Sequence, residues 1–272
     1  MPAISDTDAV DQRIALAKKV VLGQRDRLEA DLGQVASDWK ADGSRITATD
    51  IAISEAILGE ISQNFPDDQG LSEELGDPEP VDVTSRFSWV LDPIDGTNNF
   101  ATGLAACAIA LALLEDGEPI YGVIYDAARR QLMHGGPGRG MWDGDCAVHV
   151  QEMPLSRSAM VGFHSPRAAG RYPGHGEAIV SRCKVRAMGS SALHLAYVAA
   201  GLLDGVVDHN VKLWDIAAAI PMVRASGGEV RFLADSPLPL RRFDLEMPSI
   251  LYVGGCSRMC DDLAAALAAA NG

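Results

Sequence analysis

Near the start of the chain, hydrophobic residues recur at the spacing of an α-helix. In each of two segments they follow one another at steps of three or four residues, which places them on one face of a helix. They are Val10, Ile14, Ala17 and Val21 in one segment and Ile53, Ile57 and Ile61 in the other. The short oxygen-bearing side chains of Thr49 and Asp50 suit a helix N-cap. The pattern predicts two amphipathic helices, the second beginning near Thr49 or Asp50.

Short apolar runs then replace the helical period, as expected for buried β-strands. Residues 87–91, 105–114 and 119–125 are the clearest runs, and Glu-Asp-Gly-Glu at 115–118 separates the last two. An Asp-Gly pair between apolar runs is a strong β-hairpin signal. Two further segments are expected to extend the same sheet, namely 131–134 and 146–150.

Residues 156–176 mark a junction, because they are rich in Gly, Pro, Arg and His and have no clear period. We therefore expect an N-terminal half over 1–155 with helices and an antiparallel sheet, and a C-terminal half over 156–272. In the second half strands and helices alternate, and Gly227 is suited to a helix stop. Its strands are expected near Val161 and over 184–187, 203–208, 229–233 and 250–253, and its helices over 175–182, 191–200, 214–225 and at the C-terminal end. The combination predicts a layered α+β fold.

Charge restricts the classes of partner. The 272 residues contain 23 Lys+Arg and 37 Asp+Glu, which gives a formal net charge of −14, and 47% of the residues are hydrophobic. Such a chain is globular rather than disordered. Its acidity argues against nucleic acid as a partner, which needs a basic face, and against an anionic membrane surface. A small phosphate-bearing substrate remains compatible where cations are recruited locally.

Cysteines and the N-terminus indicate the compartment. The five cysteines are scattered without a C-x-x-C pair, so neither a disulfide framework nor a zinc ribbon is expected. The first residues lack the basic and apolar regions of a secretion signal. The longest strongly apolar run, 104–114, is too short to span a bilayer. We therefore expect a cytoplasmic protein that has no membrane partner.

The most informative stretch is Asp92-Pro93-Ile94-Asp95-Gly96-Thr97, which follows an apolar strand. Carboxylates at the end of a buried strand repel each other and are costly to desolvate, so they persist mostly where cations balance them. Hard oxygen ligands are those that Mg²⁺ prefers. The simpler alternative is an acidic loop with an Asx-turn.

Other phosphatase signatures do not fit this chain. Asp92 and Asp95 have two residues between them, whereas an aspartyl nucleophile belongs to an Asp-x-Asp motif. No cysteine is followed by Arg six positions later, and the alternating ligands of an EF-hand loop are missing. Without a candidate covalent nucleophile, metal-activated water is the chemistry that remains.

These residues resemble the signature of the inositol monophosphatase superfamily of Mg²⁺-dependent, lithium-sensitive phosphomonoesterases. Leu71-Ser72-Glu73-Glu74 resembles the paired-glutamate motif of the family, and residues 40–50 resemble its K…V-T-x-x-D segment. Trp214-Asp215-Ile216-Ala217-Ala218 resembles the W-D-x-A-A motif, with Gly227-Gly228 after it. The matches run in family order, and they imply a layered αβαβα sandwich and a homodimer.

The resemblance also implies the roles of individual residues. Glu74, Asp92 and the carbonyl of Ile94 would hold a first Mg²⁺, and Asp92, Asp95 and Asp215 a second. Glu74 would reach a third ion through water, whereas Glu73 is expected to be a solvated neighbour or a group that supports the ligands without binding the metal. Thr97 and Glu74 would orient and deprotonate the attacking water, with Asp50 supporting them. Asp95 and the backbone at Gly96 and Thr97 would contact the phosphate.

Substrate residues are implied by the second half. Gly189, Ser190 and the following Ser191 resemble the turn that lines the alcohol pocket of the family. Asp208 stands where inositol monophosphatases usually have a Glu that binds ring hydroxyls, although a solvated loop residue is the alternative. Arg167 and Arg171 could meet a second phosphate, or lie in a surface loop.

The expected activity is therefore Mg²⁺-dependent hydrolysis of a small phosphate monoester, with inositol monophosphate first. One departure concerns Ser44, where family members often carry Asp. The local K-x-D-x-S form resembles relatives that act on nucleotide or histidinol phosphates. Alternatives are histidinol-phosphate phosphatase, bisphosphate nucleotidase, fructose-bisphosphatase, or a non-enzymatic interaction protein with the same fold.

Overall fold

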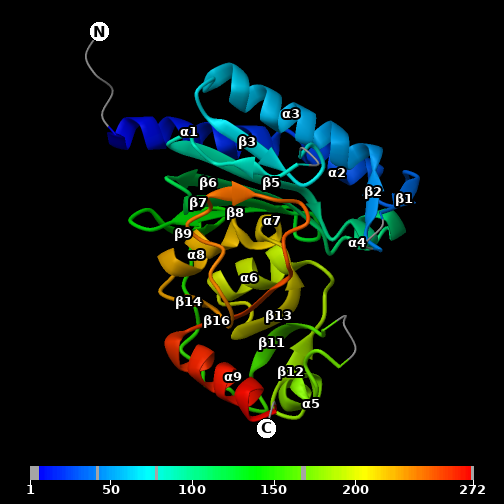
Figure 1. Ribbon diagram of the computed structural model, residues 1–272, viewed down its shortest axis with the longest axis vertical. Coiled ribbons are helices and arrows are strands. Elements are labelled where there is room, and N and C mark those ends of the chain that lie inside the picture. Colours follow the sequence, from blue (N-terminus) through cyan, green and yellow to red (C-terminus); the bar gives the residue numbers. More distant parts are fainter. Residues whose placement is uncertain (1–5, 41–42, 77–78, 167–169, 271–272) are drawn as a thin grey trace.

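Helices and β-sheets alternate in layers along the long axis of the molecule (Figure 1). The computed structural model describes residues 6–40, 43–76, 79–166 and 170–270. A seven-stranded and a five-stranded sheet form two of the layers, with helices between them and on their outer faces. This arrangement confirms the α+β fold that the sequence predicts.

The seven-stranded sheet has the order β10-β9-β8-β7-β6-β5-β3. Its strands are β3 (Gln69–Ser72), β5 (Phe87–Asp95), β6 (Ala108–Glu115), β7 (Glu118–Asp126), β8 (Gln131–Gly136), β9 (Gly140–Asp143) and β10 (Cys146–Ala147). β3 runs parallel to β5, and the other neighbours are antiparallel. Asp116 and Gly117 both have positive φ in the turn between β6 and β7, as a two-residue hairpin turn requires. The predicted hairpin is therefore confirmed.

The five-stranded sheet has the order β12-β11-β13-β16-β14. Its strands are β11 (Met160–His164), β12 (Lys184–Arg186), β13 (Gly205–Val211), β14 (Glu229–Phe232) and β16 (Ile250–Gly255). β12, β11 and β13 are parallel, whereas β16 is antiparallel to both β13 and β14. Two small pairs complete the strands, β1 (Ser37–Trp39) with β2 (Arg45–Thr47) and β4 (Val81–Asp82) with β15 (Arg242–Phe243).

Three helical layers cover these sheets. On the outer face of the seven-stranded sheet lie α1 (Asp6–Leu22), α2 (Arg25–Asp31) and α3 (Ala48–Asn64). Between the sheets lie α6 (Ser191–Ala199), α7 (Leu213–Ile216) and α8 (Ala219–Ala225). Beyond the five-stranded sheet lie α5 (His175–Val180) and α9 (Ser257–Ala270). The short α4 (Thr97–Thr102) follows directly after β5.

The structure corrects the N-cap of one predicted helix and the continuity of another. α3 begins at Ala48 because Thr47 is its N-cap, and Asp50 completes a capping box instead of opening the helix. The predicted helix over 214–225 is interrupted between α7 and α8. Pro221 explains the break, because it has no N–H to donate to the carbonyl of Ala217 and its ring would clash with that carbonyl.

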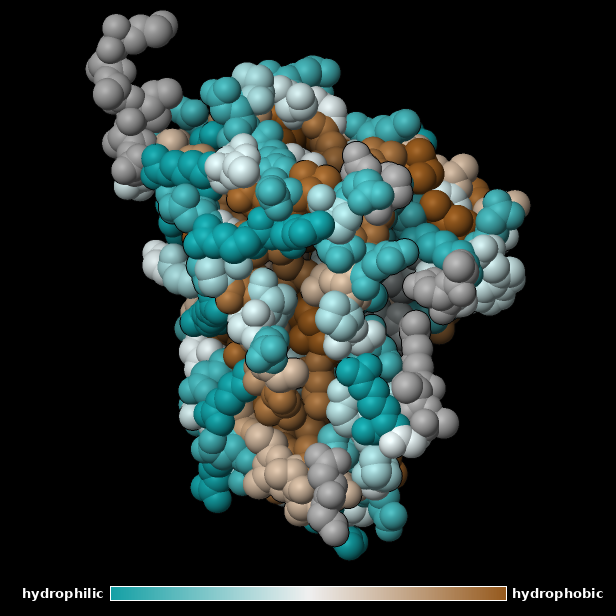
Figure 2. All heavy atoms as spheres, viewed as in Figure 1, coloured by the Kyte–Doolittle hydropathy of each residue, from teal (hydrophilic) through white to brown (hydrophobic). Residues whose placement is uncertain are grey.

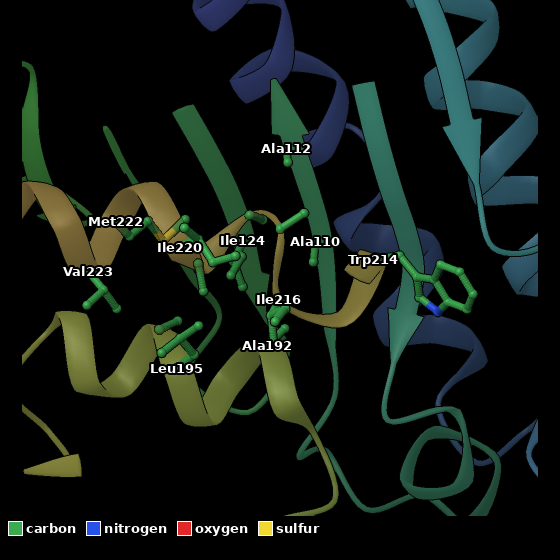
Figure 3. Close-up of a cluster of buried hydrophobic side chains, with 14 of the residues drawn as sticks. Ala110, Ala112, Ile124, Ala192, Leu195, Trp214, Ile216, Ile220, Met222 and Val223 are labelled. Atoms are coloured by element: carbon green, nitrogen blue, oxygen red, sulfur yellow. The ribbon is translucent and has the colours of Figure 1, made fainter. Parts of the chain in front are cut away.

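The middle helices pack closely on the seven-stranded sheet (Figure 3). Small side chains of β6, Ala110 and Ala112, face this layer, and Ile220 of α8 lies beside Ile124 of β7. A Cβ added at Gly122 of β7 would lie only 1.7 Å from the carbonyl oxygen of Ala218. The helix backbone therefore rests directly on the strand, and this contact fixes where α7 lies relative to β5.

One face of the molecule is mainly polar. Figure 2 shows hydrophilic residues over most of the face in view and hydrophobic residues along its middle. The most exposed large hydrophobic side chains belong to separate elements, Trp39 to β1 and Val180 to α5. Among the helices of the described residues, none has the length and hydropathy needed to cross a membrane.

Candidate active site

Strand β5 brings Asp92 and Asp95 to the same face of the sheet. Three residues apart on a regular strand, they would point to opposite faces. The pairing with β6 shifts between them, with Asp92 opposite Ala110 and Asp95 opposite Ala108. β5 therefore has one residue more than β6 at this point, as in a β-bulge. The bulge includes Pro93, which has no N–H to donate to a ladder hydrogen bond. As a result both carboxylates are buried on the side of the sheet that faces the middle helices.

Glu73 lies at the level of Asp92 on the neighbouring strand. β3 is parallel to β5 with Ser72 opposite Leu91, and the Glu73 N–H donates to the Leu91 carbonyl at 3.2 Å. Carboxylate oxygens of Glu73, Asp92 and Asp215 lie within 4.8 Å of one another. The sequence interpretation favoured Glu74 as the ligand and treated Glu73 as a solvated neighbour, but the structure groups Glu73 with the other acids. The sequence carried no local signal for this choice, because it depends on the register between β3 and β5.

Lys40 contacts both glutamates from the segment between β1 and β2. Its Nζ lies 2.8 Å from Oε1 of Glu73 and also contacts Oε1 of Glu74. Burial lowers the pKa of Lys40, but the charges and hydrogen bonds of Glu73 and Glu74 outweigh it and raise the pKa above its usual value. The lysine therefore stays charged and offsets one carboxylate of the group.

Asp215 reaches the same place from α7. It is the third residue of that helix, and its Oδ2 accepts the Lys212 N–H at 2.7 Å. Trp214 beside it is buried and packs against Phe243, with ring centroids 5.6 Å apart, which agrees with a packing role. The short helix thus turns Asp215 toward β5 and leaves its neighbour in the core.

Burial and mutual repulsion disfavour ionisation of these acids. The pKa of Asp92 is raised well above its usual value by burial, and further by Glu73 and Asp95. The pKa of Asp215 is likewise raised by burial and by Asp95 and Glu73. Burial raises the pKa of Asp95 to about 6, although hydrogen bonds from Ser190 and Ala192 counteract it. The group therefore needs protons or cations to balance its charge, and its hard oxygen donors suit Mg²⁺.

Thr97 and Asp50 lie beside the carbonyl of Ile94. The Thr97 hydroxyl donates to that carbonyl at 2.8 Å and lies 3.4 Å from Oδ1 of Asp50. The other oxygen of Asp50 accepts the Thr47 N–H at 2.8 Å, and burial raises the pKa of Asp50 to about 6. Gly96 precedes α4 with φ of 89°, and an added Cβ would lie 2.9 Å from the Ala106 carbonyl oxygen. Only glycine fits this turn, and among the described residues no side chain caps the N-terminus of α4.

The turn between β12 and α6 reaches the acids from the second half of the chain. Ser190 caps α6 and its hydroxyl donates to Oδ2 of Asp95. Gly189 precedes it with φ of 79°. The predicted substrate residues Gly189 and Ser190 therefore lie next to the predicted metal ligands. Arg167 lies outside the described residues, and Arg171 stacks on Tyr172 with its guanidinium 5.4 Å from the ring centroid.

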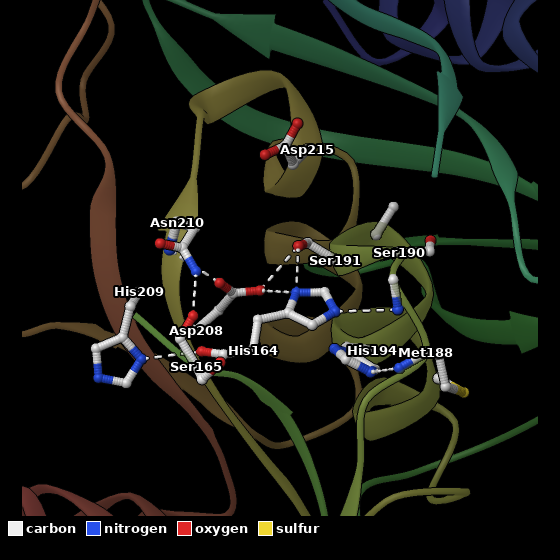
Figure 4. Close-up of polar contacts among 12 residues, drawn as sticks. His164, Ser165, Met188, Ser190, Ser191, His194, Asp208, His209, Asn210 and Asp215 are labelled. Atoms are coloured by element: carbon white, nitrogen blue, oxygen red, sulfur yellow. Dashed lines mark hydrogen bonds and ion pairs between the residues drawn. The ribbon is translucent and has the colours of Figure 1, made fainter. Parts of the chain in front are cut away.

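Asp208 is engaged by the protein itself (Figure 4). It is fully buried on β13, and its Oδ2 accepts from Nδ1 of His164 at 2.6 Å and from the Ser191 hydroxyl at 2.8 Å. Its Oδ1 accepts the Asn210 N–H at 3.0 Å. Burial raises the pKa of Asp208, but these hydrogen bonds, with His164 foremost, outweigh it and lower the pKa below its usual value. Sequence reasoning did not identify His164, because no motif connects it to Asp208.

His164, His194 and Asp208 also lie close enough to suggest a metal site, with ligand atoms within 4.8 Å. Nε2 of His194 accepts the Met188 N–H, and Nε2 of His164 accepts the Gly189 N–H, each at 3.1 Å. These bonds leave the single ring proton on Nδ1, so a metal at Nδ1 would have to displace that proton and leave each ring as an imidazolate. The group therefore fits a hydrogen-bond network and not a metal centre.

Comparisons with known proteins agree with this geometry. The model of the inositol monophosphatase family matches residues 6–269. An inositol-1-monophosphatase of Mesorhizobium japonicum is 33% identical over 75% of this chain and 79% of its own length. A protein of Pasteurella multocida named Nus factor SuhB is 35% identical over 70% of this chain and 73% of its own. The solved structure of a Thermotoga maritima IMPase has a TM-score of 0.81 at 25% identity, covering 96% of this chain and 98% of that one.

Proposed function

This chain belongs to the inositol monophosphatase family, and from that premise we propose that it hydrolyses a small phosphate monoester with Mg²⁺. The observation that carries the proposal is the partly buried group of Glu73, Asp92 and Asp215, whose oxygens converge within 4.8 Å. Lys40 contacts this group, and the single positive charge of the lysine offsets only part of the negative charge of the acids. Relatives named inositol-1-monophosphatase support inositol monophosphate as the first candidate substrate.

Two or three Mg²⁺ ions fit the donor set of the site. Glu73, Asp92, Asp95, Asp215 and the carbonyl of Ile94 would hold them, and Glu74 would reach a further ion through water. When bound, the ions clamp the phosphate and lower the pKa of the attacking water. This assignment places Glu73 first, where the sequence interpretation placed Glu74, because Glu73 lies in register with Asp92.

The side chains of the site have separate tasks in this proposal. Thr97 orients the water through its hydroxyl, which contacts Asp50 and the Ile94 carbonyl. Asp50, fixed by the N-terminus of α3, keeps that hydroxyl in place, and Glu74 receives the proton of the water. The open N–H groups where α4 begins at Thr97 face the phosphate together with Gly96.

The alcohol side of the substrate faces the turn at Gly189 and Ser190. Asp208 was expected to bind hydroxyls there, yet its oxygens are already occupied by His164, Ser191 and the Asn210 N–H. We therefore propose that Asp208 acts on this pocket indirectly. Histidinol phosphate, nucleoside bisphosphates and fructose bisphosphate are the alternative substrates.

A substrate panel tests the proposal. Phosphate release from inositol monophosphate, histidinol phosphate, a nucleoside bisphosphate and fructose bisphosphate is measured with Mg²⁺ and with a chelator. We expect the highest kcat/KM with inositol monophosphate, loss of activity with the chelator and inhibition by lithium. Activity confined to histidinol phosphate would reject the inositol assignment.

A non-enzymatic role is the second candidate, because one relative is named Nus factor SuhB. Purified protein that hydrolyses no ester of the panel but co-purifies with a defined partner would favour it. We further propose that the protein is cytoplasmic and forms a homodimer. Its free thiols agree with a reducing compartment. Light scattering of the purified chain measures the oligomeric state.

A further inference from the structure

The turn from Met188 to Ser190 is held by two histidines from different elements. His194 of α6 accepts the Met188 N–H, and His164 of β11 accepts the Gly189 N–H, both at Nε2 and at 3.1 Å (Figure 4). The two rings lie against each other with centroids 4.4 Å apart. Successive backbone N–H groups of one turn are thus bound by two imidazoles in contact, whose planes are tilted by 46°.

The other side of the same turn is bound by α4. Asn99 donates from Nδ2 to the Met188 carbonyl at 2.7 Å and to the Ala106 carbonyl at 2.8 Å. Ser190, the next residue but one, donates to the buried carboxylate of Asp95. A shift of the turn would therefore disturb the alcohol side of the site, whereas Asp95 keeps the Ala192 N–H as a second donor.

The hydrogen bonds fix the protonation of both rings. A backbone N–H can only donate, so each Nε2 is unprotonated and each ring carries its proton on Nδ1. Nδ1 of His164 donates that proton to Oδ2 of Asp208 at 2.6 Å. For His194, burial lowers the pKa to about 3, in agreement with an uncharged ring.

Asp208 binds the side of His164 that faces away from the turn. It is fully buried, and its partners are His164, the Ser191 hydroxyl and the Asn210 N–H. His164 by contrast keeps 20% of its side chain exposed. The carboxylate therefore orients the imidazole and the hydroxyl, which lie between it and the turn.

We propose that His164 and His194 form an uncharged histidine clamp that positions the Met188–Ser190 turn for the leaving-group alcohol, and that Asp208 acts through His164 and Ser191 instead of touching the substrate. The proposal rests on the proposed phosphatase function. It makes His164, His194 and Asp208 positioning residues. Loss of the clamp is expected to weaken binding of the alcohol while leaving phosphate binding at the acids intact.

The first test determines which ring nitrogen of each histidine carries the proton, and it does not depend on enzymatic activity. Long-range ¹H–¹⁵N correlation spectra of the full-length ¹⁵N-labelled protein distinguish the protonated ring nitrogen of each histidine. His164→Gln and His194→Gln assign the signals, and the exposed His149 is the internal reference. We expect the Nδ1–H form, the less common tautomer, for both clamp histidines. An Nε2–H form at either position would overturn the proposal.

The second test separates the two hydrogen bonds of His164. His164→Gln can still present an acceptor to the Gly189 N–H, whereas His164→Asn reaches only far enough to donate to Asp208. We expect His164→Asn to raise KM for the preferred ester about five- to tenfold with kcat within about threefold, as for one lost hydrogen bond. His164→Gln should restore KM to within about threefold of the parent.

Two controls separate positioning from general loss of structure. The inhibition constant of inorganic phosphate should be unchanged in both variants, and their Tm should agree with each other. If Asp208 acts through His164 and Ser191, Asp208→Asn should raise KM by a smaller factor in the His164→Asn background than in the parent protein. Equal KM values for the Gln and Asn variants, or additive losses in the double variant, would overturn the proposal. If the parent protein hydrolyses no ester, the proposed function fails, whereas the tautomer spectra still decide the clamp.

Discussion

Glu73 and Asp92 lie side by side at the ends of neighbouring parallel strands, where the Glu73 N–H donates to the carbonyl of Leu91 at 3.2 Å. Because the two strands are parallel and in register, both side chains lie on the same face of the sheet, and their oxygens converge with those of Asp215. Lys40 contacts both glutamates, but Glu74, one residue further on, is not part of the group of converging oxygens. The strand register thus gives adjacent glutamates different surroundings.

Glu73→Gln and Glu74→Gln should therefore differ in effect. We expect Glu73→Gln to reduce kcat/KM by more than about 100-fold and to weaken the apparent Mg²⁺ affinity, because it removes a direct ligand. Glu74→Gln should lower kcat by about 100-fold or more but leave the apparent Mg²⁺ affinity close to that of the parent, because it removes the group that receives the proton of the water. Steady-state kinetics over a Mg²⁺ titration measure both. A weaker Mg²⁺ affinity for Glu74→Gln than for Glu73→Gln would restore Glu74 as the principal ligand.

Thr97 provides a second matched pair. Its hydroxyl donates to the Ile94 carbonyl and lies near Asp50. Thr97→Val keeps the shape but removes the hydroxyl, and we expect a loss in kcat of about 100-fold or more, as for a group that positions the proton-transfer step. Thr97→Ser should retain activity within about tenfold. Equal rates for the Val and Ser variants would show that the hydroxyl has no part in the reaction.

The raised carboxyl pKa values predict how the stability of the metal-free protein changes with pH. Burial raises the pKa of Asp50 and Asp95 to about 6 and that of Glu74 to about 7, whereas in the unfolded chain such groups titrate near about 4. The folded state then binds more protons between these values, so this contribution to stability is present at low pH and is lost as the pH rises through 6 to 7.

We therefore expect the Tm of chelator-treated protein to be lower at pH 7.5 than at pH 5, measured by calorimetry. Mg²⁺ should reverse this difference, because the ions replace the protons. At about 100 times its dissociation constant a ligand adds about 2.7 kcal/mol to the free energy of unfolding, or about 5–10 °C in Tm for a chain of this size. The same pH slope with and without Mg²⁺ would contradict the assignment.

Gly122 tests the contact between β7 and the middle helices. A Cβ there would lie 1.7 Å from the Ala218 carbonyl oxygen, whereas a Cβ at Gly59 of α3 would meet nothing within 4 Å. We expect Gly122→Ala to lower the free energy of unfolding by about 3 kcal/mol or more, since the backbone must move. Gly59→Ala should raise it by up to about 1 kcal/mol. Urea unfolding of both variants measures the difference, and a neutral Gly122→Ala would refute the direct contact.

Periodicity and turn chemistry were sufficient for much of the fold. The hairpin at Asp116 and Gly117 and the helix face of Ile53, Ile57 and Ile61 follow from local spacing, which the structure retains. Elements determined by distant contacts were missed. β3 is four residues long and depends on its pairing with β5, so its own sequence carries little signal.

The site divides in the same way. The aspartates of β5 and α7 stand in motifs, so the sequence identified them. The choice between Glu73 and Glu74 depends on strand register, and the contact of Asp208 with His164 joins residues 44 positions apart. No local pattern encodes such a pairing, because β11 and β13 become neighbours only in the folded sheet.

The most direct measurement is phosphate release from inositol monophosphate by the parent protein and by Asp92→Asn, each over a Mg²⁺ titration from chelator-treated stocks. Asp92 is buried among the other acids, and Asn preserves its shape while removing its charge. We predict that the parent is inactive without Mg²⁺ and active with it, and that Asp92→Asn remains folded but inactive at every Mg²⁺ concentration. Hydrolysis by the metal-free parent, or by Asp92→Asn at the parental rate, would contradict a metal-dependent reaction at these carboxylates.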